Sequence, residues 1–289
     1  MTARWKAPAG GQAWIMGVLN CTPDSFSDGG EYDDIASRLA HAEAMIVAGA
    51  AIVDVGGEST RPGAQPVTED EEMRRVLPVI EVLSGKGIAV SIDTMKSGVM
   101  RAALRAGACM VNDVTALGEY GALEAVADSR ADVCLMHMRG TPLSMQHRVH
   151  YDDVVDEVLS FLEARATACI EAGIASDRIL LDPGIGFGKR LQDNIDLIAA
   201  IPRFRALGFP VLMGVSRKSF LGELSGSAVI DREIETAAAG TACVLAGADV
   251  LRVHDVAAQL RAVRVASALR DAFVSEAARK HSSNTARLA

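Results

Sequence analysis

Three polar residues, Asp93, Asn112 and Asp182, each lie at the end of a short apolar run of the sequence. Two carboxylates and one amide, if brought together, would suit the edge of a flat heterocycle with several N–H donors. A carboxylate can accept two parallel hydrogen bonds in a dry cleft. Each aspartate taken alone could instead cap the helix that follows it or pair with a nearby lysine. Three such residues in comparable positions favour a binding site.

A second set of side chains, Arg61, Arg252 and His254, is cationic or can become so. Arg252 and His254 occupy alternate positions at the end of one apolar run, so they could clamp a phosphate or pyrophosphate together. The alternative is an arginine paired with a neighbouring aspartate and a histidine packed at a rim. Lys218 could be a ligand donor or the ion-pair partner of an aspartate, and its spacing does not separate the two.

Several well-known catalytic patterns are not matched. The segment from Asp182 to Lys189 resembles a phosphate-binding loop, but Pro183 occupies the first glycine position and Arg190 follows the lysine. Ser216 follows an apolar run but lacks the second glycine of a nucleophile elbow. The five cysteines are scattered and form no Cys-x-x-Cys pair, so a zinc site is not expected.

Eight short apolar runs alternate with helix-length stretches, which predicts βαβ units. The runs are Trp14 to Asn20, Ile52 to Gly56, Ile88 to Asp93, Cys109 to Asp113, Asp132 to Met138, Ile179 to Asp182, Val211 to Ser216 and Val250 to His254. Their near-continuous apolar character and a repeat of roughly 30 residues favour an α/β fold, a single-domain (β/α)8 TIM barrel, over a doubly wound open sheet. Active sites of such barrels lie at the carboxyl ends of the strands, where the polar residues occur.

Two expected βα loops, at residues 21–30 and 56–64, are long and rich in glycine. This composition is typical of mobile functional loops, and Phe26 and Arg61 have little structural reason to lie at loop tips. The chain shows no linker, charge block or low-complexity tract. We therefore expect one domain over residues 12–280, flanked by terminal extensions at 1–11 and 281–289.

The charge of the chain excludes one class of partner. Its 289 residues carry 29 Lys and Arg against 37 Asp and Glu, a formal charge of -8. That is the wrong overall sign for a protein that neutralises nucleic-acid phosphates. The first residues contain no apolar signal core, and the longest uncharged run is too short for a membrane helix. We expect a cytoplasmic protein with no nucleic-acid or membrane partner.

Two long motifs, Gly17-Val-Leu-Asn-Cys-Thr-Pro-Asp-Ser-Phe-Ser-Asp-Gly-Gly30 and Asp54-Val-Gly-Gly-Glu-Ser-Thr-Arg-Pro-Gly63, resemble the signature segments of the bacterial dihydropteroate synthases. Shorter motifs follow in that family's order: Ser91 to Thr94, Asn112 and Asp113, Met136 to Met138, Asp182 to Gly188, Ser216 to Phe220 and Arg252 to Asp255. The resemblance spans about Trp14 to Ala266. Cys21 departs mildly from the β-branched aliphatic residue usual there, which affects no expected catalytic residue.

The resemblance implies a dimeric TIM-barrel transferase of folate biosynthesis. It would join 7,8-dihydropterin-6-ylmethyl pyrophosphate to p-aminobenzoate and release pyrophosphate, without a covalent enzyme intermediate. Catalytic roles would fall to Asp93, Asp182, Lys218, Arg252 and His254. The implied pterin ligands are Asp93, Asn112, Met136, Asp182, Phe187, Lys218 and Arg252, and the pyrophosphate ligands are Asn20, Thr60, Arg61, Arg252 and His254. Asn20 would also bind the cofactor Mg2+. The p-aminobenzoate pocket would contain Phe26, Arg61, Pro62, Phe187 and Ser219, and sulfonamides would inhibit by occupying it.

Three other functions share parts of this pattern. A corrinoid methyltransferase barrel has the same Asp, Asn and Asp set but little use for pyrophosphate ligands. A pterin-binding relative without synthase activity should have lost the first loop, Arg252 or His254. A phosphate-handling isomerase or aldolase would use Lys218 in a Schiff base, which borohydride trapping would detect.

Overall fold

The computed structural model describes residues 5–7, 12–22, 31–61, 63–146 and 149–285. Within them, eight strands form one parallel sheet in the order β6-β5-β4-β3-β2-β1-β8-β7. The strands are β1 (Trp14–Asn20), β2 (Ile52–Gly56), β3 (Val90–Asp93), β4 (Met110–Asp113), β5 (Asp132–Met136), β6 (Ile179–Asp182), β7 (Leu212–Met213) and β8 (Val250–Val253). A parallel bridge between Leu181 and Val211 joins β6 to β7, so the sheet curls into a nearly closed barrel. The predicted TIM barrel is confirmed, and the open sheet is excluded.

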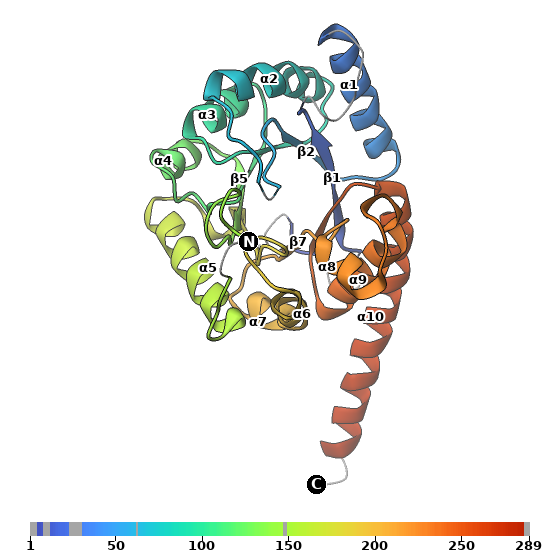
Figure 1. Ribbon diagram of the computed structural model, residues 1–289. Helices are drawn as coiled ribbons and strands as arrows, with labels where there is room; N and C mark the ends of the chain where they lie inside the picture. Colours follow the sequence, from blue (N-terminus) through green and yellow to red (C-terminus); the bar gives the residue numbers. More distant parts are fainter. Residues whose placement is uncertain (1–4, 8–11, 23–30, 62, 147–148, 286–289) are drawn as a thin grey trace.

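Helices surround the barrel as a ring (Figure 1). Within the described ranges they are α1 (Glu31–Val47), α2 (Glu69–Gly85), α3 (Ser97–Arg105), α4 (Ala122–Ala127), α5 (Val154–Glu171), α6 (Leu191–Ala199), α7 (Ile201–Ala206), α8 (Ser219–Ser225), α9 (Glu233–Ala246) and α10 (Val256–Thr285). Helix α10 projects beyond the barrel and reaches into the expected C-terminal extension (Figure 1). None of these helices combines the length and the apolar character needed to cross a membrane.

The predicted strand bounds agree with the structure for β1, β2 and β6. The largest difference is at β7, where the apolar run from Val211 to Ser216 forms a strand only at Leu212–Met213. Arg217 adopts a left-handed conformation with φ 58°, and the backbone N–H of Lys218 turns back to the carbonyl oxygen of Val215. This turn ends the strand early and directs the following residues over the mouth of the barrel.

Local sequence signals explain the helix that follows β5. The carboxylate of Asp153 accepts a hydrogen bond from the backbone N–H of Asp156 at 2.9 Å, which caps the first turn of α5. Val154, Val158 and Leu162 recur at helical spacing and are buried. The position of α5 therefore follows from one capping residue and one apolar face.

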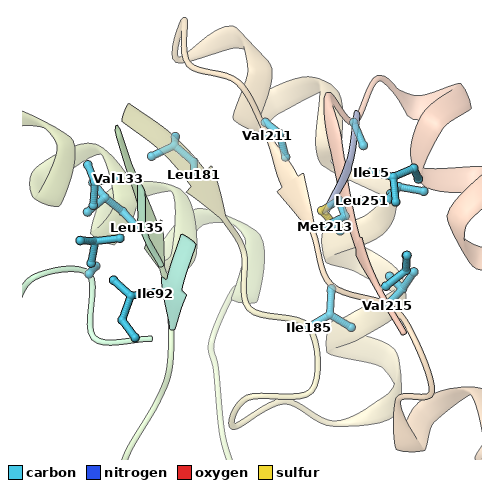
Figure 2. Packing of buried hydrophobic residues seen from close by; sticks show 14 of the residues in the cluster. Ile15, Ile92, Val133, Leu135, Leu181, Ile185, Val211, Met213, Val215 and Leu251 are labelled. Carbon is cyan, nitrogen blue, oxygen red and sulfur yellow. The ribbon is translucent and has the colours of Figure 1, made fainter. Parts of the chain in front are cut away.

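Two apolar layers hold the barrel together. The outer layer joins outward-facing strand residues to the helices, and Figure 2 shows Ile15 and Leu251 in one part of it and Val133 and Leu135 in another. The second layer fills the amino-terminal half of the barrel with Trp5, Met16, Ile52, Met110, Cys134, Leu180, Leu212 and Val250. Side chains alternate along a strand, so the residue two positions after each of these strand residues also faces the interior. The next interior positions are therefore those of the expected site.

Trp5 closes the amino-terminal end of the barrel. Its side chain is 3% exposed, and its indole Nε1 donates to Asp132 Oδ2 at 2.7 Å. This residue lies in the segment expected to be a terminal extension, yet it belongs to the packed interior. The domain boundary at residue 12 stays a prediction, but residue 5 contributes to the same core.

We expect Trp5→Ala to lower the free energy of unfolding by about 3 kcal/mol or more, because it leaves a cavity and removes the indole hydrogen bond to the buried Asp132 carboxylate. Urea unfolding followed by circular dichroism measures this. Tyr120→Ala is the control, since Tyr120 is 99% exposed and should change stability by less than about 0.5 kcal/mol. Equal stability of the Trp5 variant and the wild type would show that residue 5 is not part of the core.

Candidate functional site

The carboxyl ends of the strands bring the predicted polar residues to one end of the barrel. Alternation places Asn112 two positions after Met110, Asp182 after Leu180 and Arg252 after Val250, so all three face the barrel interior. Arg252 lies at the centre of a network: its Nε donates to Asp54 Oδ2 and its Nη2 donates to Asp93 Oδ2, each at 2.6 Å. Asn112 Nδ2 donates to the same Asp54 oxygen at 3.0 Å. Three residues predicted from sequence therefore share a network with one that was not.

Asp54 is the residue that sequence reasoning missed. It lies in the middle of β2 between Val53 and Val55 and is fully buried. The sequence does contain a signal for it, a carboxylate inside an otherwise apolar strand. A charge buried in this way needs a partner, so such a residue is a candidate for a polar network. Two buried oxygens, Asp54 Oδ1 and Asn112 Oδ1, accept no hydrogen bond from the described residues. Such oxygens are acceptors available to a ligand with N–H donors.

Burial controls the protonation of these acids. Burial raises the pKa of Asp93 to about 7, while the Arg252 guanidinium opposes the rise and the Asp54 carboxylate adds to it. Burial also raises the pKa of Asp182, opposed by the Gly184 N–H and by the charges of Lys218 and Lys189. Asp54 and Asp93 share one guanidinium, and among the described residues Asp54 Oδ1 and Asn112 Oδ1 receive no hydrogen bond. The site is built for a ligand that brings hydrogen-bond donors.

The loop after β6, residues 182–189, folds back on itself and holds Asp182 in place. Asp182 Oδ1 accepts the backbone N–H of Gly184 at 2.7 Å. Gly184, Gly186 and Gly188 all have left-handed φ angles, of 73°, 83° and 65°. A Cβ at Gly184 would also clash with the carbonyl oxygen of His137. The glycines that resemble a phosphate-binding loop are therefore explained by backbone conformation and close packing.

Lys218 and Phe187 lie together at the same end of the barrel, where Lys218 Nζ is 4.1 Å from the centroid of the Phe187 ring. Burial lowers the pKa of Lys218 to about 8, with a smaller effect of Arg252 in the same direction. Ser219 follows as the first residue of α8 and is exposed, while Met136 at the end of β5 is buried. Lys218 forms no carboxylate ion pair within 4.0 Å among the described residues, so the rim ion pair considered from sequence is not found there.

His254 supplies a neutral imidazole to the cationic side of the site. Its Nδ1 lies 2.9 Å from Ser216 Oγ, and Ser216 Oγ accepts the His254 backbone N–H at 3.2 Å. The Ser216 hydroxyl is then free to donate to Nδ1, which leaves the ring proton on Nε2. Burial lowers the pKa of His254 to about 3, and Arg252, Arg217, Lys218 and Arg61 add to the shift in that order. An anion bound here would meet a cluster of positive charge and an N–H donor.

The remaining predicted residues lie at the rim. Asn20 ends β1 and is half-buried, Thr60 is half-buried in the loop after β2, and Arg61 beside it is exposed. Arg252 pairs with Asp54 and Asp93 rather than with an aspartate next to it in sequence. Phe26 and Pro62 lie outside the described residues.

Comparison with known proteins decides the family. Residues 16–254 match the pterin-binding enzyme family. A dihydropteroate synthase of Neisseria meningitidis is 50% identical over 262 residues, which cover 88% of this chain and 92% of that protein. This chain belongs to the dihydropteroate synthase family of pterin-binding enzymes. The predicted family is confirmed.

Solved structures of other dihydropteroate synthase family members have the same barrel. The Xanthomonas albilineans enzyme with 4-aminobenzoic acid superposes with a TM-score of 0.84 at 49% identity, covering 90% of this chain and 93% of that one. The Yersinia pestis enzyme in a sulfonamide drug complex superposes with a TM-score of 0.86 at 43% identity, covering 93% of this chain and 98% of that one.

Proposed function

We propose that this chain condenses 7,8-dihydropterin-6-ylmethyl pyrophosphate with p-aminobenzoate to give 7,8-dihydropteroate and pyrophosphate. One observation carries the proposal: a buried group of hydrogen-bond acceptors lies beside a cationic rim at the same end of the barrel. The acceptors are Asp54, Asp93 and Asp182. Arg61 and Lys218 are among the cations whose charge lowers the pKa of His254. The family relationship supports the same reaction.

The acceptors bind the pterin. Asp182 is buried with one oxygen on the Gly184 N–H, so its other oxygen is available to a pterin N–H. The unpartnered oxygens of Asp54 and Asn112 take further donors of the same ring system. Met136 and Phe187 provide apolar contact, and Lys218 donates from the mouth. A ligand that lacks these donors would leave buried acceptors unpaired, which explains selectivity for the pterin edge.

The cations stabilise the leaving group. In the reaction, the bond between the exocyclic methylene carbon and the pyrophosphate oxygen breaks, and pyrophosphate leaves with the electron pair. The p-aminobenzoate nitrogen donates its lone pair to that carbon and then loses a proton. We assign Nη1 of Arg252 and Nε2–H of His254 to the departing oxygens, together with Asn20, Thr60 and Arg61. Asp93 stabilises positive charge on the ring, so no covalent enzyme intermediate is needed.

Mg2+ fits the proposed pyrophosphate site at Asn20, whose amide oxygen is a hard ligand at the end of β1. Among the described residues, no group of three or more His, Cys, Asp or Glu side chains could enclose a metal ion. The cation would therefore be held by Asn20, substrate oxygens and water, a common arrangement for Mg2+. When bound, it neutralises charge on the leaving pyrophosphate. Chelation with EDTA should abolish product formation, with pterin affinity largely retained and activity restored by added Mg2+.

The p-aminobenzoate pocket is assigned to the surroundings of Lys218, which contacts the Phe187 ring and precedes Ser219 in sequence. Arg61, Phe26 and Pro62 are proposed to complete it from the first two βα loops. Closure of these loops would exclude water, which could otherwise capture the cationic carbon as an alcohol.

Sulfonamides should act as competitive inhibitors because they imitate p-aminobenzoate. We expect a sulfonamide to raise the apparent KM for p-aminobenzoate and leave the maximal rate unchanged. Initial rates of pyrophosphate release, measured over a matrix of both concentrations, test this. Benzenesulfonamide without the para-amino group should inhibit at least tenfold less strongly. A lowered maximal rate at saturating p-aminobenzoate would contradict a shared pocket.

We further propose a homodimer in the cytoplasm. Large apolar side chains are exposed in the carboxyl-terminal part of the chain, including Leu224, Ile230, Ile234 and Phe273, the last three being 82%, 82% and 61% exposed. Apolar residues of α6, α8 and α9 line a cavity of about 340 Å³ beside them. Exposed apolar residues of this size are candidates for burial between two copies of the chain. Sedimentation equilibrium measures the oligomeric state, and cell fractionation tests the location.

A coupled assay tests the enzymatic proposal directly. It measures pyrophosphate release and dihydropteroate formation with pterin pyrophosphate and Mg2+, with and without p-aminobenzoate. Product formed only with both substrates supports the synthase. Tight pterin binding without product would instead indicate a pterin-binding protein or a methyltransferase that uses the same pocket.

A further inference from the structure

Lys189 is a buried lysine in the loop that carries Asp182 and Phe187. It lies at the end of the 182–189 loop and is 4% exposed. Its Nζ is 3.0 Å from His137 Nδ1 and donates to the carbonyl oxygens of Phe187 at 3.0 Å and of His137 at 3.3 Å. The ammonium therefore connects the loop that carries Asp182 and Phe187 to the end of β5.

In the described part of the chain, the charge of Lys189 has no carboxylate in direct contact. Among the described residues, no carboxylate oxygen lies within 4.0 Å of its Nζ, and its three contacts are with neutral acceptors. A buried cation of this kind is costly unless nearby negative charge offsets it. The Asp182 carboxylate supplies that negative charge, and Gly184 lies between the two side chains. The Gly184 N–H donates to Asp182 Oδ1, and a Cβ built on Gly184 would lie 3.3 Å from Lys189 Nζ.

We propose that Lys189 is a positioning residue for the pterin site, which holds the 182–189 loop against β5 and keeps the buried Asp182 carboxylate ionised. The inference rests on the proposed function, because it assigns Lys189 to the pocket in which Asp182 accepts pterin N–H groups. Lys189 contacts no part of the proposed substrate position directly. It acts through Asp182 and through the backbone that carries Phe187.

The surrounding charges agree with this role. Asp182 from β6 and Asp193 from α6 favour the ammonium, whereas Lys218 from the β7–α8 turn and Arg139 from the segment after β5 oppose it. Burial lowers the pKa of Lys189 to about 7, with Asp182 the strongest opposing influence. The pKa of His137 is lowered to about 3 by burial and then by Lys189, so its ring stays a neutral acceptor. Below pH 7 Lys189 is therefore mostly protonated, and its positive charge favours the ionised form of Asp182.

The test separates the charge from the hydrogen bonds. Lys189→Met removes both, whereas Tyr151→Phe removes a hydrogen bond to the same loop, from Tyr151 Oη to Gly188 O at 2.9 Å, and no charge. Affinity for 6-hydroxymethylpterin is measured by calorimetry from pH 5 to 7.5. Affinity falls on the acid side where Asp182 becomes protonated. In Lys189→Met we expect this fall to begin at a higher pH than in the wild type, and affinity on the acid side to drop about tenfold, because the Lys189 charge that lowers the pKa of Asp182 is gone. In Tyr151→Phe the fall should stay at the wild-type pH.

Several outcomes would overturn the proposal. If Lys189→Met binds with the wild-type pH profile, or if both variants shift equally, Lys189 has only a structural role. The pKa of Asp93 is also raised to about 7, so the comparison of pH profiles is repeated with Asp93→Asn in both proteins. If Lys189→Met no longer moves the pH profile in that background, the effect belongs to Asp93 and the positioning role of Lys189 is refuted. Circular dichroism checks folding, and Lys189→Gln replaces the methionine variant if that one fails to fold. If the wild type binds no pterin, the proposed function itself fails.

Discussion

Replacing Asp182 with alanine should reduce pterin affinity by at least about a hundredfold. The side chain is buried at the end of β6 and, in the proposed complex, accepts N–H donors of the pterin. A hydrogen bond to a charged group is worth roughly 1.5–3 kcal/mol, and the variant also leaves pterin donors buried without an acceptor. A loss of about 3 kcal/mol corresponds to the expected factor. Calorimetry with 6-hydroxymethylpterin measures it.

Asp113 offers a matched control, because it is also a buried aspartate at the end of a strand. Its oxygens accept the backbone N–H groups of Thr115 and Leu117, each at 2.8 Å, so they are used within the protein. Asp113→Asn should lower stability and leave pterin affinity within about threefold of the wild type. Unchanged binding in Asp182→Ala, or equal losses in both variants, would refute the assignment of Asp182.

The barrel could be predicted because its strands are buried on both faces. Apolar runs such as Ile52 to Gly56 and Ile179 to Asp182 are visible in sequence, and their bounds agree with the structure. Trp5 could not be placed in the same way, because a single aromatic residue among polar neighbours has no periodicity. Its burial arises from the open end of the barrel, which exists only after all the strands have assembled.

The site was predictable to the extent that its residues end strands. Asp93, Asn112, Asp182 and Arg252 are visible as polar residues after apolar runs, and the structure brings them together. Asp54 lies inside a strand, and its role depends on Arg252, 198 positions away in sequence. Lys189 was set aside with a failed phosphate-loop pattern, since neither its burial nor its distance from carboxylates can be read from spacing.

Replacing Arg252 with methionine should reduce kcat/KM by about a thousandfold or more. The guanidinium is assigned to the departing pyrophosphate, and it also holds Asp54 and Asp93 in place through two 2.6 Å bonds. Removing a preorganised donor to developing negative charge costs about a hundredfold to a thousandfold by itself. Loss of the ordered carboxylates adds to this. Pyrophosphate release with both substrates measures the change, and Arg178→Met is the control, because Arg178 bonds the Ala131 carbonyl away from the site.

The same variant should change how stability depends on pH. Without the guanidinium, the pKa of Asp93 rises further above its ordinary value of 3.8, because the charge that most opposes the effect of burial is removed. The folded state then binds more protons than the unfolded state between about pH 4 and the raised pKa, so stability falls as pH rises through that range. Urea unfolding at pH 5 and pH 8 should show a larger decrease in Arg252→Met than in the wild type. Adding Asp93→Asn should restore stability at pH 8 but not activity, whereas recovery of both would mean that Arg252 serves the carboxylates and not the pyrophosphate.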